Sequence, residues 1–184
     1  MFIELLIFCI PISIFVFAAY YIAFWVTWDF SERLDIPYIP TPLYSLSQIA
    51  YRLVIRKGDI VYDIGCGDGR LLFYCAKRYP AAKFIGIELN PMLVAWIKLR
   101  KFAARAHNVE IRRENIFEAD VSNATKIYAF LLPDLTDKFF SDRTFSGVRI
   151  VSRAFQIRGR KPKETFRITP HDIWYGGHLA YVYE

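Results

Sequence analysis

The chain has 184 residues, enough for at most one ordinary domain with an appended segment, and 54% of them are hydrophobic, which is high for a soluble protein. Its formal net charge is +6. The three cysteines, Cys9, Cys66 and Cys75, lie in unrelated settings, which argues against a disulfide framework or a zinc site and suits a reducing compartment.

The hydrophobic residues are concentrated near the N-terminus. The 24 residues from Leu5 to Trp28, LLIFCIPISIFVFAAYYIAFWVTW, are uncharged. As a helix they would extend roughly 36 Å, enough to cross a bilayer with some tilt. We therefore predict a transmembrane anchor within residues 1–28. A cleaved signal peptide is less suitable, because the run is too long and has neither a positive start nor a small-residue cleavage site. That peptide and a buried core helix are the alternatives.

The charges around this run indicate an orientation. No Lys or Arg precedes it, Arg33 follows it closely, and Arg52, Arg56 and Lys57 lie further on, which favours a cytoplasmic position for the rest of the chain. Without residues 1–28 the chain holds 24 basic and 17 acidic residues, a net charge of +7. Such a domain would be attracted to an anionic bilayer, although ordinary solubilising charge is an equal explanation. We expect a single-pass membrane protein.

Residues 29–42, DFSERLDIPYIPTP, form the predicted linker, because three prolines among its last six residues favour a stiff, extended segment. Residues 43–184 form the predicted domain. We expect helices over 43–55, 70–79, 91–106 and 134–143, and strands over 59–65, 83–89, 109–115, 126–133 and 148–155. This alternation predicts an α/β fold: a Rossmann-like parallel sheet with helices on both faces. Segments 164–169 and 179–184 are predicted to close the sheet as antiparallel strands.

The segment VYDIGCGDGR, residues 61–70, connects the first predicted strand to its helix. Gly65, Gly67 and Gly69 would let the chain turn sharply and let a ligand approach the backbone, and the amides near Gly69 and Arg70 favour an anionic group. Glu88 ends the second strand, 19 residues after Gly69. An acidic side chain at that place can accept hydrogen bonds from both hydroxyls of a ribose.

Two nucleotide classes fit this arrangement. The dinucleotide pattern G-x-G-x-x-G fails, because the position of its third glycine is occupied by Arg70. Asp63 is placed to bind an ammonium group, and the glycine carbonyls are further acceptors. A cationic amino-acid end beside a ribose indicates S-adenosyl-L-methionine. An NAD-type site and a glycine turn without a ligand are the alternatives.

On these motifs the chain resembles the class I methyltransferases. DIGCGDGR looks like their first motif, GIELN like their second, and RRENIF lies where the segment after the third strand contacts adenine. The resemblance implies a cofactor site made of Asp63, Gly65, Cys66, Gly67, Asp68, Gly69, Arg70, Glu88, Leu89 and Asn90. It also implies that Asn115 accepts a hydrogen bond from the adenine amino group. Ile116 would pack on the adenine, although it also fits a plain core position.

The end of the fourth strand, FLLPDL, departs from the Asn/Asp-Pro-Pro-aromatic pattern of enzymes that methylate bases or amides. Those enzymes need a polar side chain to hold a planar amino group. Leu132 and Pro133 instead offer an apolar rim, which suits a flexible amine that enters a narrow channel.

A closer resemblance is to membrane-anchored protein-lysine methyltransferases, whose mitochondrial members act on adenine nucleotide translocase and the c-subunit of ATP synthase. It lies in the anchor, YIPTP, DIGCGDGR, IELNP, AFLLP and the terminal IWYGGHLAYVYE. It implies that Tyr38 and Thr41 close over the methionine end of the cofactor, unless they belong to a simple linker. Trp174 and Tyr175 would form a wall of the substrate channel, unless they only pack in the terminal hairpin.

The loop RGRKPK, residues 158–163, has no match in that family and belongs to the densest basic region of the chain. Three interpretations are open: a solvated face, a contact with anionic lipids, or a binding surface for the phosphate backbone of a nucleic acid. We do not expect nucleic acid, because Phe155 and Phe166 lie at strand positions typical of a core. The region contains Arg149, Arg153, Arg158, Arg160, Lys161, Lys163 and Arg167. The three histidines have no metal-ligand spacing.

Together these features predict a membrane-anchored methyltransferase that modifies a lysine of a membrane protein. No catalytic base or metal is expected, because an apolar channel favours the neutral amine of a lysine, whose ordinary pKa is about 10.4. The alternatives are a methyltransferase for a lipid-soluble small molecule and a membrane-tethered binding module without turnover. The sequence assigns no substrate and no oligomeric state.

Overall fold

The computed structural model describes residues 10–22, 38–168 and 178–184, within two compact units, Met1–Pro37 and Tyr38–Glu184. In the first unit, residues 10–22 form a helix of about 20 Å. Among the described residues no helix is long and apolar enough to cross a membrane. The predicted transmembrane helix is therefore not confirmed, and the remaining residues of the run Leu5–Trp28 lie outside the described part.

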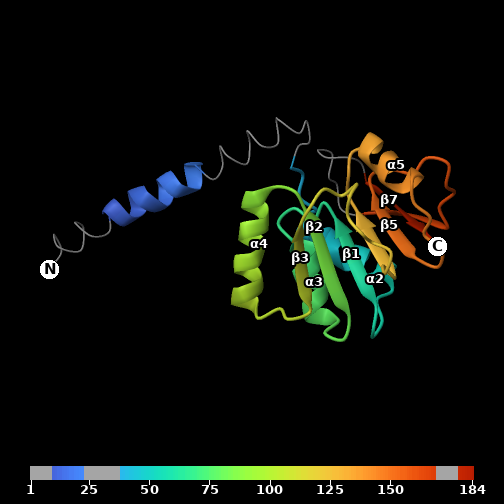
Figure 1. Ribbon diagram of the computed structural model, residues 1–184, viewed down its shortest axis with the longest axis horizontal. Helices are drawn as coiled ribbons and strands as arrows, with labels where there is room; N and C mark the ends of the chain where they lie inside the picture. The colour runs from blue at the N-terminus through green and yellow to red at the C-terminus, as the bar shows by residue number, and fades with distance from the viewer. Residues whose placement is uncertain (1–9, 23–37, 169–177) are drawn as a thin grey trace. The chain divides into compact units, whose positions relative to one another are not determined.

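The second unit contains a seven-stranded sheet in the order β3-β2-β1-β4-β5-β7-β6 (Figure 1). The first five strands in this order are parallel, and β7 is antiparallel to both β5 and β6. This confirms the predicted parallel sheet with closing antiparallel strands. The strands are β1 Ile60–Ile64, β2 Lys83–Glu88, β3 Val109–Arg113, β4 Lys126–Ala129, β5 Arg149–Arg153, β6 Glu164–Arg167 and β7 Leu179–Tyr183.

Helices cover both faces of this sheet, as predicted. One core contains residues of α2 and α3 together with Val61, Tyr128 and Val151, which lie on one face of the sheet. The other core contains Phe139 and Phe140 of α5 packed with residues of the opposite face. The helices are the 3-10 turn η1 Leu43–Ser45, α2 Leu46–Leu53, α3 Arg70–Arg78, α4 Pro91–Ala104 and α5 Pro133–Ser141.

The central strand explains the parallel arrangement. Four of the five residues of β1 are buried, which requires neighbouring strands on both sides and helices on both faces. Because β1 to β5 run in the same direction, their carboxyl ends meet at one edge of the sheet. Ligands of open parallel sheets bind at this edge.

Close packing between α3 and β2 depends on Gly86. A Cβ atom at this position would lie 2.5 Å from Cδ1 of Leu72 and 2.7 Å from Sγ of Cys66. Both neighbours are nearly inaccessible to solvent, at 1% and 7% exposure. The absent side chain of Gly86 thus lets α3 and the β1–α3 turn approach the sheet.

We expect Gly86→Ala to lower the free energy of unfolding by about 1–3 kcal/mol, the usual cost of overpacking a core. Urea denaturation would measure this loss. In the double variant Gly86→Ala/Leu72→Ala, the total loss should be smaller than the sum of the single losses, because the truncated leucine makes room. An unchanged unfolding midpoint for Gly86→Ala would show that the contact is not tight.

Candidate functional site

The β1–α3 turn has a conformation that favours glycine at three positions. Gly65, Gly67 and Gly69 have φ values of 72°, 58° and 71°, in the left-handed region. A Cβ atom at Gly65 would lie 3.0 Å from Cδ2 of Leu131, and one at Gly67 would lie 2.8 Å from the ring of Tyr38. The glycines are therefore required both by the backbone and by the side chains that approach it.

Three carboxylates lie around this turn. Asp63 is buried at the end of β1, and Glu88 lies at the end of β2. Burial raises the pKa of Asp63 to about 8, and the negative charges of Glu88 and Asp68 add to the effect. Burial also raises the pKa of Glu88. A cationic ligand would relieve this repulsion, so the turn is suited to the ammonium group predicted from the sequence.

Glu88 also holds the turn in shape. Its Oε2 accepts a hydrogen bond from the backbone N–H of Gly67 at 2.9 Å, and its Oε1 accepts one from the N–H of Asn90 at 2.8 Å. The carboxylate is thus fixed between the glycine turn and the start of α4. The ribose role of Glu88 stays a prediction.

Arg70 forms an ion pair with Asp68, in which its Nη2 donates to Oδ2 at 2.7 Å. Burial raises the pKa of Asp68, but the hydrogen bonds and charge of Arg70 outweigh it and hold that pKa below its ordinary value. The same guanidinium donates through Nη1 to the carbonyl oxygen of Thr41 at 2.8 Å. Arg70 therefore connects the glycine turn to the segment before η1.

The segment Tyr38–Pro42 packs against the turn, whereas contacts of Tyr38 and Thr41 with the methionine end of the cofactor stay a prediction. Thr41 is 7% exposed, and its Oγ1 lies 2.8 Å from the hydroxyl oxygen of Tyr128 on β4. The ring of Tyr38 lies against Gly67, and burial raises its pKa to about 12. These residues belong to the folded domain, which begins at Tyr38.

Of three further residues of the predicted cofactor site, two have visible structural roles. Oδ1 of Asn90 accepts hydrogen bonds from the N–H groups of Met92 and Leu93 and so caps α4. The side chain of Cys66 is buried next to Gly86, and burial raises the pKa of its thiol well above the ordinary value. Leu89 is half-buried between Glu88 and Asn90.

The adenine-contacting residues predicted after β3 reach the same edge of the sheet. Glu88 and Arg113 are paired in register, and Asn115 follows two residues later. Its Oδ1 accepts a hydrogen bond from the N–H of Phe117 at 3.1 Å. Ile116 is half-buried and packs against the core that contains Phe139 and Phe140 of α5. The adenine roles of Asn115 and Ile116 stay predictions.

The predicted apolar rim lies where β4 continues into α5. Leu132 is half-buried at the start of α5, and Pro133 is exposed in its first turn. Leu131 approaches Gly65 closely, although no pattern in the sequence had singled it out. The predicted channel residues Trp174 and Tyr175 lie outside the described residues.

Tyr128 and Arg153 are two buried residues whose importance the sequence did not reveal. Tyr128 aligns with Asp63 on the neighbouring strand, and its hydroxyl contacts Thr41. Arg153 ends β5 at 2% exposure, with its guanidinium 4.2 Å from the ring centroid of Phe130. Its Nε and Nη1 have no hydrogen-bond partner within the described ranges, and burial lowers its pKa. Arg153 appeared in the sequence only as one of many basic residues, and its burial depends on the pairing of β5.

The basic region around RGRKPK is largely paired. Arg149 and Lys163 both form ion pairs with Glu184, and Arg158 pairs with Asp137 at 3.2 Å. Arg160 donates to the carbonyl oxygens of Phe140 and Arg143. These contacts engage most of the basic side chains of this region, so fewer of them are free to contact a phosphate backbone.

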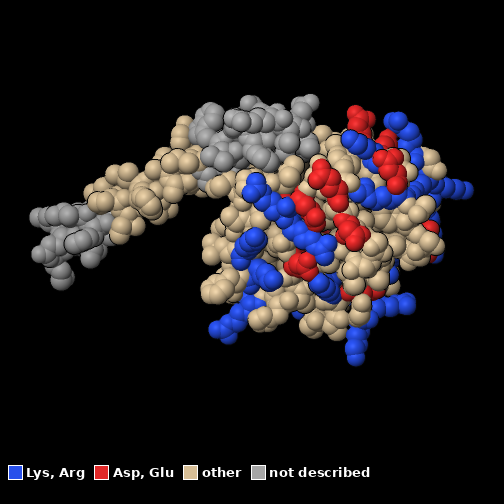
Figure 2. Space-filling view, viewed as in Figure 1, with Lys and Arg blue, Asp and Glu red and all other residues tan. Residues whose placement is uncertain are grey.

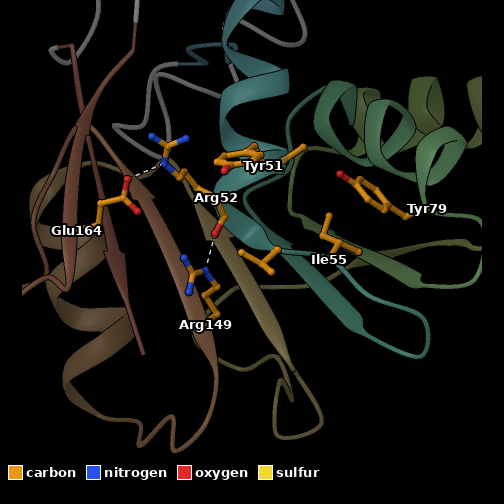
Figure 3. A pocket seen from close by; sticks show the side chains of 8 residues that line it. Tyr51, Arg52, Ile55, Tyr79, Arg149 and Glu164 are labelled. Carbon is orange, nitrogen blue, oxygen red and sulfur yellow. Dashed lines mark hydrogen bonds and ion pairs between the residues drawn. The ribbon is translucent and has the colours of Figure 1, made fainter.

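A separate pocket of about 540 Å³ lies at the opposite edge of the sheet, near the first residue of β5 (Figure 3). The charged side chains that line it bind to one another or to the backbone: Arg52 pairs with Glu164 at 2.7 Å, and Arg149 donates to the carbonyl oxygen of Arg52. The glycine turn lies at the carboxyl ends of the strands, so this pocket is not part of the candidate cofactor site. Its lining residues are Ala50, Tyr51, Arg52, Val54, Ile55, Tyr79, Arg149 and Glu164.

The model of the ANTKMT methyltransferase domain matches residues 63–164, more than half of the chain and all of the elements from the glycine turn to the start of β6. The chain belongs to this methyltransferase family. It is 33% identical over 155 residues to a protein-lysine N-methyltransferase of Saccharolobus islandicus, covering 80% of this chain and 92% of that protein. It is 27% identical over 165 residues to a Caenorhabditis elegans lysine N-methyltransferase of the ATP synthase c-subunit, covering 83% and 82% of the two chains.

A solved structure shares the fold. The crystal structure of an RNA methyltransferase from Salinibacter ruber, in complex with S-adenosyl-L-homocysteine, has a TM-score of 0.68 and 30% sequence identity, covering 79% of this chain and 92% of that one. With the family match, this identifies the protein as a methyltransferase whose cofactor is S-adenosyl-L-methionine. The residues present fit that group: a glycine turn with no room for side chains, a buried acid at Asp63 and a second acid at Glu88.

We expect Glu88→Ala to weaken cofactor binding by about 10- to 150-fold, because hydrogen bonds to a charged acceptor contribute roughly 1.5–3 kcal/mol. Titration calorimetry with S-adenosyl-L-homocysteine measures the change, and Glu88→Gln should lie between wild type and Glu88→Ala. Glu110→Ala is the matched control, since Glu110 lies on neighbouring β3 and pairs with Lys83 and Arg112. Unchanged affinity in a folded Glu88→Ala variant would contradict the ribose role.

Cofactor binding should release protons through Asp63. With its pKa raised to about 8, this group is largely protonated at pH 7 in the free protein. An ammonium group favours the carboxylate, so binding at pH 7 should release up to about one proton, and affinity should rise as the pH is raised toward 8. Calorimetry in buffers of different ionisation enthalpy measures this release. Asp63→Asn should lose it, and a binding heat independent of buffer in the wild type would disprove the assignment.

Proposed function

We propose that this protein transfers the methyl group of S-adenosyl-L-methionine to lysine side chains of proteins, and that its targets lie at a membrane. The observation that supports the lysine substrate most directly is the 33% identity to a protein-lysine N-methyltransferase over most of both chains. The apolar residues after β4 also support a lysine substrate, because Leu131 and Leu132 could pack against the aliphatic part of a lysine side chain.

The site needs few chemical groups for this reaction. The cofactor supplies an electrophilic methyl group on a sulfonium. The lone pair of the neutral lysine amine forms the new N–C bond while the C–S bond breaks, leaving S-adenosyl-L-homocysteine, and the methylated ammonium later loses a proton to solvent. An apolar approach past Leu131 and Leu132 would favour the neutral amine, and fixed alignment of the two reactants would supply most of the acceleration.

The membrane part of the proposal rests on residues 5–28. This run is uncharged, and its described portion, residues 10–22, is a helix with exposed apolar side chains such as Phe15 and Phe17. A single-pass anchor would confine the active site to a thin layer above the bilayer and so raise the effective concentration of targets there. The sparse basic residues after the run favour a cytoplasmic domain.

One observation favours a second substrate class. The similar protein from Salinibacter ruber is described as an RNA methyltransferase. Against RNA, the positive charges of the RGRKPK loop are mostly paired with Glu184, Asp137 and backbone carbonyls. A lipid-soluble small molecule is the third class, because the anchor would place the site near such molecules.

One experiment separates these classes. Membranes and cytosol of a deletion strain are incubated with the purified full chain and cofactor labelled in its methyl group, and label is measured in protein, RNA and lipid fractions. We expect label in membrane protein, with methyl-lysine peptides identified by mass spectrometry. Glu88→Ala should reduce the labelling by about 10-fold or more at limiting cofactor.

The matched control is Asp142→Ala, which removes an exposed acid at the end of α5 and should label like wild type. Label in RNA or lipid, with none in methyl-lysine, would replace the lysine proposal by one of the other classes. Cofactor binding without label in any fraction would favour a binding module without turnover.

A further inference from the structure

Helix α4 is apolar on two opposite sides. Val94 and Ile97 are buried and face the sheet. On the other side, Trp96, Leu99 and Phe102 are 52%, 59% and 84% exposed. At 100° per residue these three side chains, with Ala95 and Ala103, form one stripe that faces away from the buried pair. Surface helices ordinarily place polar residues there, so an exposed apolar stripe marks an interaction surface.

Basic residues flank this stripe, and acidic residues are missing from the helix. Lys98 and Arg105 are exposed, and Arg100 and Lys101 are half-exposed. Within the described part of the chain, no ion pair includes a side chain of α4. In Figure 2 the surface where Figure 1 places α4 shows basic and uncharged atoms, while the acidic side chains lie nearer the sheet. This differs from the RGRKPK loop, in which Arg158 and Lys163 form ion pairs.

Helix α4 also lies at an accessible edge. It packs beside β3, the edge strand of the sheet, and is the outermost element on that side of the domain (Figure 1). It begins at Pro91, directly after its cap Asn90 and three residues after Glu88. A surface bound along α4 would therefore adjoin the cofactor edge without covering the strands' carboxyl ends.

We infer that the outer face of α4 docks on an anionic membrane surface, with Trp96, Leu99 and Phe102 inserted among the headgroups and Lys98 and Arg105 contacting lipid phosphates. Exposed aromatic and aliphatic residues between Lys and Arg are the composition of helices that lie in the membrane interface. A symmetric dimer through this face would bring the basic flanks of two copies together, and that repulsion disfavours a second copy as the occupant.

This inference goes beyond the proposed function, because it concerns how the domain itself meets the bilayer and does not depend on lysine as the acceptor. An anchor alone would not determine which face of the domain lies toward the bilayer. Docking of α4 would fix which side of the domain faces the lipid.

The test uses the full chain, reconstituted into vesicles and labelled at one cysteine with an environment-sensitive fluorophore. All versions contain Cys9→Ser, and Cys66 and Cys75 are buried. Leu99→Cys reports on α4, Ser122→Cys is the control in an exposed turn elsewhere on the domain, and Ile14→Cys reports on the anchor. The vesicles are phosphatidylcholine with or without phosphatidylglycerol, and brominated lipids serve as quenchers.

We expect the label at position 99 to shift to the blue and to be quenched in vesicles with phosphatidylglycerol, and the label at 122 to do neither. The effect at 99 should weaken without phosphatidylglycerol and in Lys98→Glu/Arg105→Glu. Arg100 is left unchanged because its Nη1 donates to the carbonyl oxygen of Asp68 in the cofactor turn. Binding of S-adenosyl-L-homocysteine should be the same in all versions, which verifies the fold.

Two results would overturn the inference. If position 14 is shielded while position 99 stays in water, the anchor stands and α4 does not dock. If position 99 is shielded without vesicles and the mass of the particle doubles in detergent, the stripe is an interface between copies. Neither result bears on methyl transfer to lysine, which is measured separately.

Discussion

The site depends on buried negative charge held in place by backbone amides. Glu88 accepts hydrogen bonds from Gly67 and Asn90, so one carboxylate joins the end of β2 to the β1–α3 turn and to the start of α4. Asp63 lies in the same buried setting, where the charge of Glu88 adds to the effect of burial and raises its pKa. The free protein thus maintains an acidic site whose ionisation a cationic ligand would stabilise. The glycines, the tight contact at Gly86 and the covering segment at Tyr38 all serve to hold this turn.

Most of the fold could be predicted because its determinants are local. The apolar runs of β1 and β2 and the glycine turn each specify their own element, and the βαβ order then requires parallel pairing. Contacts between distant segments could not be predicted. Thr41 meets Tyr128, 87 positions later in the chain, and Leu131 reaches Gly65 only because β4 lies next to β1. The bond between Thr41 and Arg70 likewise joins distant segments, so the sequence could not predict it.

Charge was the least predictable feature, because a sequence shows where basic residues are dense and not where they are paired. The RGRKPK loop looked like the strongest basic surface, yet its partners Asp137 and Glu184 come from elsewhere in the chain. Arg153, from the same dense region, is buried against Phe130. Helix α4 shows the reverse. Its apolar residues predicted a helix, but only the exposure of Trp96 and Phe102 shows that they fall on two opposite faces.

Hydrogen bonds connect the cofactor turn to α4 at two places along the helix. Asn90 caps the helix while its N–H binds Glu88, and further along the helix Arg100 donates to the carbonyl oxygen of Asp68. If α4 lies on a bilayer, these hydrogen bonds then help to set the height of the methyl-transfer site above the lipid. Acceptor lysines at that height would be methylated in preference to others on the same protein.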